Sequence, residues 1–360
     1  MRVALIASPF IPIPPRRYGG TELFIANLAE GLKRVGITAI VYSNGESTVD
    51  AENRWRYPES EWPLASEGSG MFKELDHVSW AVHDAARDCD LLHINSAPAV
   101  TYSRYVSRPF VCTLHHPYEQ ALAHFYGRNP KVFYTSISHH QASLHPMLKL
   151  STIHHGLDFR QYRLQREKEG YLCFLGRIAP IKGTHLAIQV AKRAGIPLKI
   201  AGEVQPIYRS YFETTIQPHI DGKFIEYLGE VGLEAKNQLL GGAMGLLFPI
   251  QWEEPFGLVM VESMACGTPV FAFPGGAVPE IVSEGISGNI SNSIAEMANA
   301  VQNLNFSPHM VRTWAQAMFS VERMVDRYAE LYRAILNRSA VKNRVEVHST
   351  GNTSDAETAA

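Results

Sequence analysis

Two glutamates placed eight positions apart are the residues of this chain whose spacing most directly suggests chemistry. Glu254 and Glu262 belong to the stretch E-E-P-F-G-L-V-M-V-E-S-M-A-C-G-T-P-V, which runs from residue 253 to residue 270. The proline and glycine within residues 255–257 predict a loop, and residues 258–266 predict a helix that ends at Gly267. Glu262 then lies about one turn inside the helix, and Glu254 lies just before it.

The segment between the two glutamates has the properties of an anion site. The first N–H groups of a helix have no acceptor within the helix and lie at the positive end of its dipole, so they would stabilise a diphosphate. A carboxylate on each side could bind hydroxyl groups, ribose on one side and hexose on the other, as a sugar nucleotide requires. An amphipathic helix with solvated glutamates is the alternative, and it explains Glu262 alone equally well.

Two further segments could contact phosphate. Arg177 and Lys182 stand just before a helix expected from Thr184, so both cations could reach one phosphate group. Two solvated surface charges are the alternative. Gly19 and Gly20 end a proline-rich loop between a predicted strand and a predicted helix. They do not form G-x-G-x-x-G, which argues against a nicotinamide or flavin dinucleotide site, and a plain flexible turn is the alternative.

Composition limits the class of protein. A length of 360 residues predicts two domains, and a net charge of −2 gives no positive field for nucleic acid. The four cysteines are scattered and lie in or beside apolar segments, which indicates buried free thiols and agrees with a reducing cytosol. The short apolar run at the N-terminus is broken by Pro9 and predicts a strand rather than a signal peptide. No apolar window approaches the ~18 residues of a spanning helix, so we expect a cytoplasmic protein.

Apolar runs alternate with amphipathic segments along most of the chain, which predicts an α/β fold with parallel sheets. Val3 to Ala7 and Tyr171 to Leu175 have the pattern of buried strands that open two separate units. Near the end we expect helices over residues 293–304 and 307–336, followed by a disordered polar tail.

The stretch around the two glutamates resembles the signature of glycosyltransferase family 4, retaining enzymes with the GT-B fold. The similarity covers residues 3 to about 335 and is strongest over 171–282. It implies two doubly wound Rossmann-like domains that face each other across a crevice. We expect an acceptor-side domain over residues 1–160, a donor domain over 161–315, a helix over 316–337 that crosses back to the first domain, and the tail over 338–360.

The resemblance also implies site residues. Arg177 and Lys182, in a G-R-x-x-x-x-K-G element, would neutralise the donor diphosphate, Glu262 would bind the ribose, and Glu254 would bind the hexose. His115 would line the sugar pocket, although His116 could take that place. The catalytic residues expected in this way are His115, Arg177, Lys182 and Glu254, and the donor-binding residues are Gly19, Gly20, Arg177, Lys182, Gly202, Val231, Glu254, Phe256, Gly257, Leu258 and Glu262.

Two features concern histidines. His155 stands where the family usually has asparagine, so no role is carried over to it. Several histidine pairs could suggest a metal site, but they show neither H-x-x-x-H spacing nor an accompanying carboxylate or cysteine at ligand intervals. We therefore expect no metal and no cofactor, with the nucleotide sugar acting as a substrate.

The expected activity is retaining, metal-independent transfer of a hexose, with glucose from UDP-glucose as the first choice. The acceptor would be a sugar or a lipid-linked glycan in cell-surface or exopolysaccharide synthesis, with peripheral contact to the inner membrane as an option. First-domain loops around Arg16, Tyr18, His116 and Tyr118 would select it. Glucosylation of a small molecule and non-catalytic binding of a nucleotide sugar are the alternatives.

Overall fold

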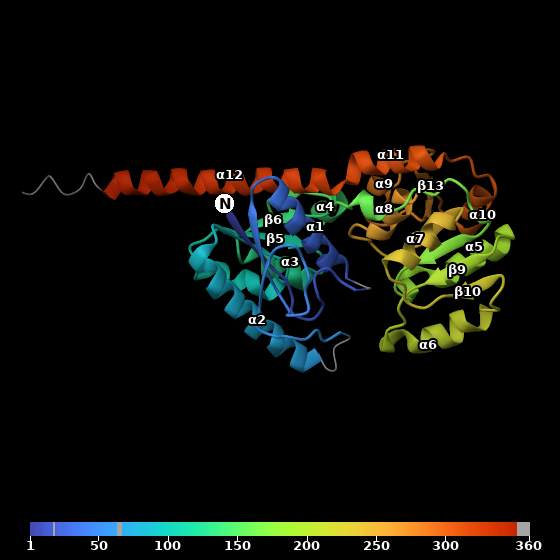
Figure 1. Ribbon diagram of the computed structural model, residues 1–360, viewed down its shortest axis with the longest axis horizontal. Helices are drawn as coiled ribbons and strands as arrows, with labels where there is room; N and C mark the ends of the chain where they lie inside the picture. Colours follow the sequence, from blue (N-terminus) through green and yellow to red (C-terminus); the bar gives the residue numbers. More distant parts are fainter. Residues whose placement is uncertain (17–18, 63–66, 351–360) are drawn as a thin grey trace, which may run out of the picture.

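The computed structural model describes residues 1–16, 19–62 and 67–350 of the chain, and for residues 67 and 340–350 it describes the backbone alone. Within these ranges the chain forms two parallel sheets, each covered by helices, which lie side by side (Figure 1). We call the part around the first sheet the first half and the part around the second sheet the second half. This arrangement confirms the expected fold of two doubly wound α/β units.

The first sheet has seven strands and the second has six, all parallel to their neighbours. In spatial order the first sheet contains β3 (Glu52–Trp55), β2 (Thr38–Ser43), β1 (Arg2–Ile6), β4 (Leu91–Ile94), β5 (Phe110–Leu114), β6 (Phe133–Ser136) and β7 (Leu150–Thr152). The second contains β10 (Ile225–Tyr227), β9 (Leu198–Ala201), β8 (Leu172–Leu175), β11 (Gly245–Phe248), β12 (Val270–Ala272) and β13 (Gly288–Ile290).

The helices connect these strands and cover both faces of each sheet. The α-helices are α1 (Gly20–Arg34), α2 (Glu67–Asp88), α3 (Gln120–Gly127), α4 (His139–Ser143), α5 (Thr184–Ala194), α6 (Arg209–Tyr211), α7 (Leu233–Gly242), α8 (Leu258–Ala265), α9 (Val278–Ile281), α10 (Ile294–Gln302), α11 (Pro308–Phe319) and α12 (Val321–Thr350). Short 3₁₀ or π turns lie at Ala97–Arg104, Phe159–Gln161, Pro180–Lys182, Pro206–Tyr208, Phe212–Ile216 and Gln217–His219.

Strand β1 shows why an unbroken apolar run forms a central strand. Successive side chains point to opposite faces of a sheet. Val3 and Leu5 therefore pack in the core beneath α1 and α12, whereas Ala4 and Ile6 pack in the core beneath α2. Both faces are buried from Val3 to Ile6, so these four positions of the strand are apolar, whereas Arg2 at its start is only half-buried.

The strand orders fix where a ligand can bind. In each sheet the order in which successive strands are added reverses once. The reversal lies between β1 and β4 in the first half and between β8 and β11 in the second half. Loops that follow neighbouring strands at such a switch point diverge and leave a crevice at the carboxyl ends of the strands. The two crevices face each other where the halves meet.

The last helices depart from the sequence-based expectation. One helix was expected over residues 307–336, but Ser320 is extended (φ −70°, ψ 149°) and separates α11 from α12. The break is stabilised by pairing with the segment that leaves the first half: the Leu157 N–H donates to the Phe319 carbonyl (2.9 Å), and the Val321 N–H donates to the Leu157 carbonyl (3.0 Å). This pairing between distant segments has no signal in helical periodicity.

Helix α12 returns to the first half and packs on α1 (Figure 1). A disordered tail was expected after Asn337, yet the helix continues to Thr350, in a stretch without proline or glycine. Residues 351–360 of the expected tail lie outside the described residues. Among the described residues, no helix is both long and apolar enough to cross a membrane.

Candidate active site

A cavity of about 450 Å³ lies where the two halves meet, at the carboxyl ends of both sets of strands. All twelve residues that the sequence analysis selected line it: Gly19, Gly20, His115, Arg177, Lys182, Gly202, Val231, Glu254, Phe256, Gly257, Leu258 and Glu262. They come from six separate segments, each of which follows a different strand, so their convergence is a property of the fold. The roles assigned to them stay predictions.

Glu254 lies in the loop after β11 and is 7% exposed. Its Oε2 accepts hydrogen bonds from Lys182 Nζ (2.6 Å) and from Trp252 Nε1 (2.9 Å). The same ammonium lies 4.3 Å from the centre of the Trp252 ring, within cation–π range. Lys182 and Glu254, predicted from two separate motifs, therefore form one ion pair in the cavity wall.

Glu262 lies in the second turn of α8 and is paired in the same way. Its Oε1 accepts hydrogen bonds from Lys236 Nζ (2.6 Å) and from the Tyr162 hydroxyl (2.7 Å). Burial and the neighbouring carboxylate raise the pKa of Tyr162 well above 10, so its hydroxyl stays protonated and donates. The sequence analysis missed both partners, because one lies on α7 and the other in the segment between the halves.

The turn before α8 requires glycine. Gly257 has φ +84°, in the left-handed region, and a Cβ there would come within 2.6 Å of the Met260 methyl. Helix α8 begins at Leu258 and ends at Ala265, close to the predicted range, and Gly267 follows with φ +76°. Leu258 and Val259, whose N–H groups have no acceptor within the helix, line the cavity between the two glutamates.

Arg177 provides a second cation, from the loop after β8. Its Nη1 donates to Gln205 Oε1 at 3.4 Å, and its Nε is buried without a hydrogen-bond partner among the described residues. Gly202 allows this loop to approach β9, because a Cβ on Gly202 would clash with the carbonyl oxygen of Gly176. A buried donor without a partner is costly, so an anion at this position would be favourable.

Two carboxylates lie at the same end of the cavity. Glu203 and Glu230 both line it, near Val231. Burial, with the charge of Glu230 as the next cause, raises the pKa of Glu203. The sequence analysis selected neither residue.

Histidines form the first-half wall. His115 directly follows β5, and its Nε2 lies 2.9 Å from Oδ1 of Asn95, which directly follows β4. Because the amide oxygen only accepts, Nε2 is the donor, and Nδ1 is left as a buried acceptor with no partner in the part of the chain that the structure describes. Burial, followed by the charges of neighbouring histidines, holds the pKa of His115 well below 6.5, so the ring is neutral near pH 7.

His155 also lines the cavity, with its ring stacked on that of His115 (centroids 5.4 Å apart, 14° between planes). The aromatic ring of Phe24 lies 5.0 Å from His115 and 4.9 Å from His155. The departure from asparagine at position 155 thus places a second neutral imidazole against the first.

The structure describes three of the four residues expected to select an acceptor, and of these three only His116 is part of the cavity lining. His116 lines the cavity, Arg16 pairs with Glu46 (3.2 Å), and Tyr118 packs edge-on against His145. Tyr18 lies outside the described residues.

Two family models match this chain. The model described as "Glycosyltransferase Family 4" matches residues 18–164, and the model described as "Glycosyl transferases group 1" matches residues 158–317. One lies on the first half and the other on the second half, so together they account for both walls of the cavity.

Among curated proteins, D-inositol 3-phosphate glycosyltransferase of Mycobacterium marinum is 28% identical over 222 residues, which is 58% of this chain and 44% of that protein. The chain thus spans less than half the length of this relative. The O-antigen chain mannosyltransferase C of Escherichia coli is 22% identical over 363 residues, covering 89% of this chain and 96% of that protein.

Solved structures agree on the fold. AviGT4, a glycosyltransferase involved in avilamycin A biosynthesis, superposes with a TM-score of 0.70 at 25% identity, covering 93% of this chain and 98% of its own. Anabaena HepE in complex with UDP and glucose gives 0.73 at 18% identity, covering 93% and 100%. With two matching models, this fold and the paired glutamates in the cavity, the chain belongs to the glycosyltransferases of the family 4 type, with the GT-B fold.

Proposed function

We propose that this protein is a retaining, metal-independent hexosyltransferase that takes glucose from UDP-glucose. The observation that carries the proposal is the placement of two buried carboxylates, each paired with its own lysine, on either side of the start of α8. Such a cavity offers acceptors for sugar hydroxyls and cations for a diphosphate in one place. The likeness to Anabaena HepE, whose structure was also solved in complex with UDP-glucose, supports the choice of donor.

The chemistry follows from the charges. When the glycosidic bond of the donor breaks, the departing diphosphate gains negative charge, and preorganised donors lower the free energy of that transition state. Arg177 Nε is buried without a hydrogen-bond partner among the described residues, and the N–H groups of Leu258 and Val259 have no acceptor within α8. Lys182, now on Glu254, would turn toward the phosphate, and Glu254 would then accept from the hexose hydroxyls.

Lys236 completes this charge arrangement. Its ammonium would neutralise the Glu262 carboxylate, so that the carboxylate can accept from the ribose hydroxyls without placing a bare negative charge beside the diphosphate. Neutral His115 would contribute its free Nδ1 as an acceptor for a sugar hydroxyl.

For the acceptor, we propose a sugar or lipid-linked glycan of a surface polysaccharide, reached at the cytoplasmic side of the membrane by peripheral contact. The likeness to the O-antigen mannosyltransferase over nearly its whole length supports this choice. The likeness to AviGT4 favours the alternative, glucosylation of a small molecule.

Slow hydrolysis of UDP-glucose without an acceptor, in excess EDTA, tests the central proposal. We expect turnover to persist, because protein cations replace the metal. Lys182→Ala should lower kcat/KM by about 10²–10³, since it removes one donor to the developing charge. Hydrolysis that stops with EDTA and returns with Mg²⁺ or Mn²⁺ would contradict metal independence. Tight UDP-glucose binding without any turnover would indicate a non-catalytic binding protein.

The stereochemistry gives a second test. With an α-linked donor, the first-formed product should carry an α-linkage, because the acceptor attacks from the face that the diphosphate leaves. Proton NMR during the first turnovers distinguishes the anomers. An initial β-linked product would rule out retention while leaving the donor assignment intact.

A further inference from the structure

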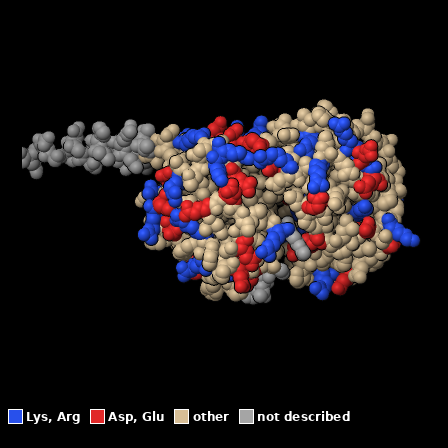
Figure 2. All heavy atoms as spheres, viewed as in Figure 1, with Lys and Arg blue, Asp and Glu red and all other residues tan. Residues whose placement is uncertain are grey.

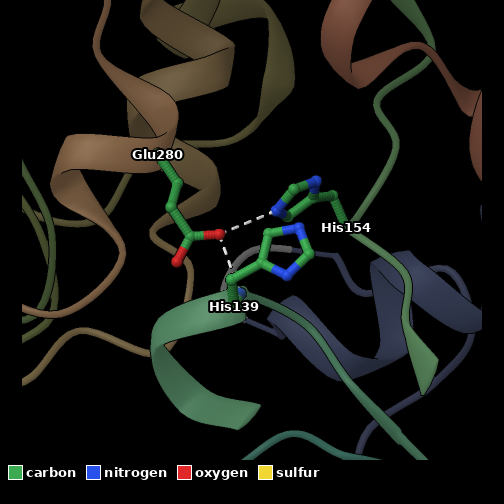
Figure 3. A group of neighbouring side chains, drawn as sticks. All are labelled: His139, His154 and Glu280. Atoms are coloured by element: carbon green, nitrogen blue, oxygen red, sulfur yellow. Dashed lines mark hydrogen bonds and ion pairs between the residues drawn. The ribbon is translucent and has the colours of Figure 1, made fainter. Parts of the chain in front are cut away.

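Two histidines and a glutamate meet outside the cavity, at the junction of the two halves. His139 is the first residue of α4, His154 follows β7, and Glu280 lies on α9 of the second half. One nitrogen of each imidazole and a carboxylate oxygen lie within 4.8 Å of one another. Figure 3 shows the two rings and the carboxylate converging from three separate segments.

The carboxylate is held in place by the backbone. Glu280 Oε2 accepts from the N–H of His139 (2.8 Å), and Oε1 accepts from the N–H of His140 (2.6 Å). These are the first two N–H groups of α4, which have no acceptor within the helix. Oε1 keeps lone-pair capacity for a further partner, whereas Oε2 also contacts His154 Nε2 (3.0 Å) and would exchange that contact for an ion.

The His154 ring is held by packing. It lies 5.9 Å from the Phe256 ring and 5.7 Å from the Phe319 ring, and its Nε2 points at Glu280 Oε2 (3.0 Å). The His139 ring lies edge-on to it, at 5.5 Å and 85°, and is exposed, so it can turn without disturbing the core. Two of the three groups are therefore preorganised and the third is adjustable.

We propose that His139, His154 and Glu280 bind a zinc ion. Two imidazole nitrogens and a carboxylate oxygen form a donor set that zinc takes, with bonds of about 2.0–2.2 Å and an open fourth position. Ligand atoms around such a tetrahedral ion are roughly 3.3 Å apart, close to the separation of His154 Nε2 and Glu280 Oε2. Mg²⁺ prefers oxygen ligands in an octahedron and fits this set poorly.

The sequence analysis argued against a metal because no histidine pair had ligand spacing. The fold supplies what the spacing did not, since the three ligands are 15 and 126 positions apart along the chain. An ion here would connect α4 and the segment after β7, both in the first half, to α9 in the second half. The three ligands are not among the residues that line the cavity, so zinc binding can be measured without the donor.

Calorimetric titration of Zn²⁺ into metal-free, untagged protein tests the proposal, with thermal unfolding as a second measurement. The wild type should bind one ion and unfold at a higher Tm with zinc, because zinc would bind only the folded state. His139→Ala should weaken binding by at least about 10–100-fold while keeping the metal-free Tm. Co²⁺ should give the visible absorption of a tetrahedral complex in the wild type and lose it in the variant.

His83→Ala is the matched control, because His83 is an exposed histidine on α2, and it should bind zinc as the wild type does. Absence of zinc binding in the wild type would overturn the proposal. So would equal affinity in His139→Ala, or an equal loss in His83→Ala. These measurements use no donor, so they can fail while UDP-glucose hydrolysis succeeds, and the reverse.

Discussion

At the residue scale, Glu254 and Glu262 bring two like charges into one cavity, and each is neutralised by its own lysine. Removing one partner of a buried ion pair leaves the other charge uncompensated, so each pair has to be tested by what it does to ligand binding as well as to stability. The two pairs differ in their place relative to the start of α8, which gives them separable roles.

Substitution of the two glutamates should separate those roles. Glu262→Ala should weaken binding of both UDP and UDP-glucose by about 1–3 kcal/mol, because a charged acceptor for the ribose is lost. Glu254→Ala should leave UDP affinity nearly unchanged while kcat falls, because UDP lacks the hexose that this carboxylate would hold.

Calorimetric titration of UDP into both variants measures the difference. Glu262→Gln is the matched control, because it keeps one acceptor oxygen and the packing on α8, and it should fall between wild type and alanine. Equal losses of UDP affinity in the two alanine variants, or a loss only in Glu254→Ala, would mean that the polarity of the site is reversed.

The sequence located both cavity carboxylates and the lysine that pairs with Glu254, but it did not locate the partners of Glu262. Glu254, Lys182 and Arg177 stand in short motifs, where local spacing carries the signal. Lys236 and Tyr162 contact Glu262 from positions 26 and 100 residues away in the sequence. Their contacts depend on how α7 and the segment between the halves pack against α8. The periodicity of a single sequence indicates helices and strands but not which distant side chains meet, so these contacts could not be predicted.

At the element scale, the contact between α1 and α12 is close because of a glycine. A Cβ on Gly31 would clash with a methyl group of Val325 and lie 3.2 Å from its Cβ. The two helices therefore approach at a position where no larger residue fits. Helix α12 joins the second half to the core of the first half, so this contact also bears on how the halves are held.

Gly31→Ala should destabilise the protein by about 1–2 kcal/mol. Overpacking costs roughly 1–3 kcal/mol and exceeds the gain of up to ~1 kcal/mol in helix propensity. Urea unfolding measures the change. Val325→Ala in the same chain should recover part of the loss, as expected for residues in direct contact.

Gly68→Ala is the control for helix propensity, because a Cβ at this exposed position of α2 would meet nothing within 4 Å. It should be neutral or stabilising. A Gly31→Ala variant as stable as Gly68→Ala would show that α12 does not press on α1 in solution.

Elements were predicted well where one pattern decides them and poorly where two segments compete. Strand β1 and helix α8 followed from apolar runs and glycines. The break at Ser320 did not, because Phe319 and Val321 give up helical hydrogen bonds for pairing with Leu157. Nothing in the local sequence there stops a helix.

At the scale of the whole molecule, charge of both signs is interspersed on the face that Figure 2 shows, in keeping with a net charge of −2. Three buried histidines in the interior have shifted pKa values. Burial lowers the pKa of His77 to about 4 and that of His93 to about 3, and the pKa of His115 is lowered well below 6.5. All three are neutral in the folded protein near pH 7.

These histidines should make the fold acid-sensitive. Their folded pKa lies below the unfolded value of about 6.5, so below that pH the unfolded state binds more protons and stability falls as pH falls. Each histidine lowers the free energy of unfolding by up to about 1.4 kcal/mol per pH unit, so the three together lower it by up to roughly 4 kcal/mol per pH unit. Urea unfolding at a series of pH values from about 7.5 to about 5 measures the slope.

His77→Gln removes one of the three groups, so it should lower the slope of unfolding free energy against pH by up to about 1.4 kcal/mol per pH unit. Stability that stays constant from about pH 7 to about pH 5 would mean that these rings are not buried as neutral groups.

The return of α12 to the first half also sets an order of events during synthesis. Strand β7 closes the first sheet at Thr152, but the core beneath that sheet includes apolar residues of α12 as far as Ile335. The ribosome adds roughly 180 residues between these points, which takes on the order of 10–40 s at ~5–20 residues per second. During that time the nascent first half exposes the apolar face that α12 later covers. We expect chaperones that recognise exposed apolar surface to bind it at this stage.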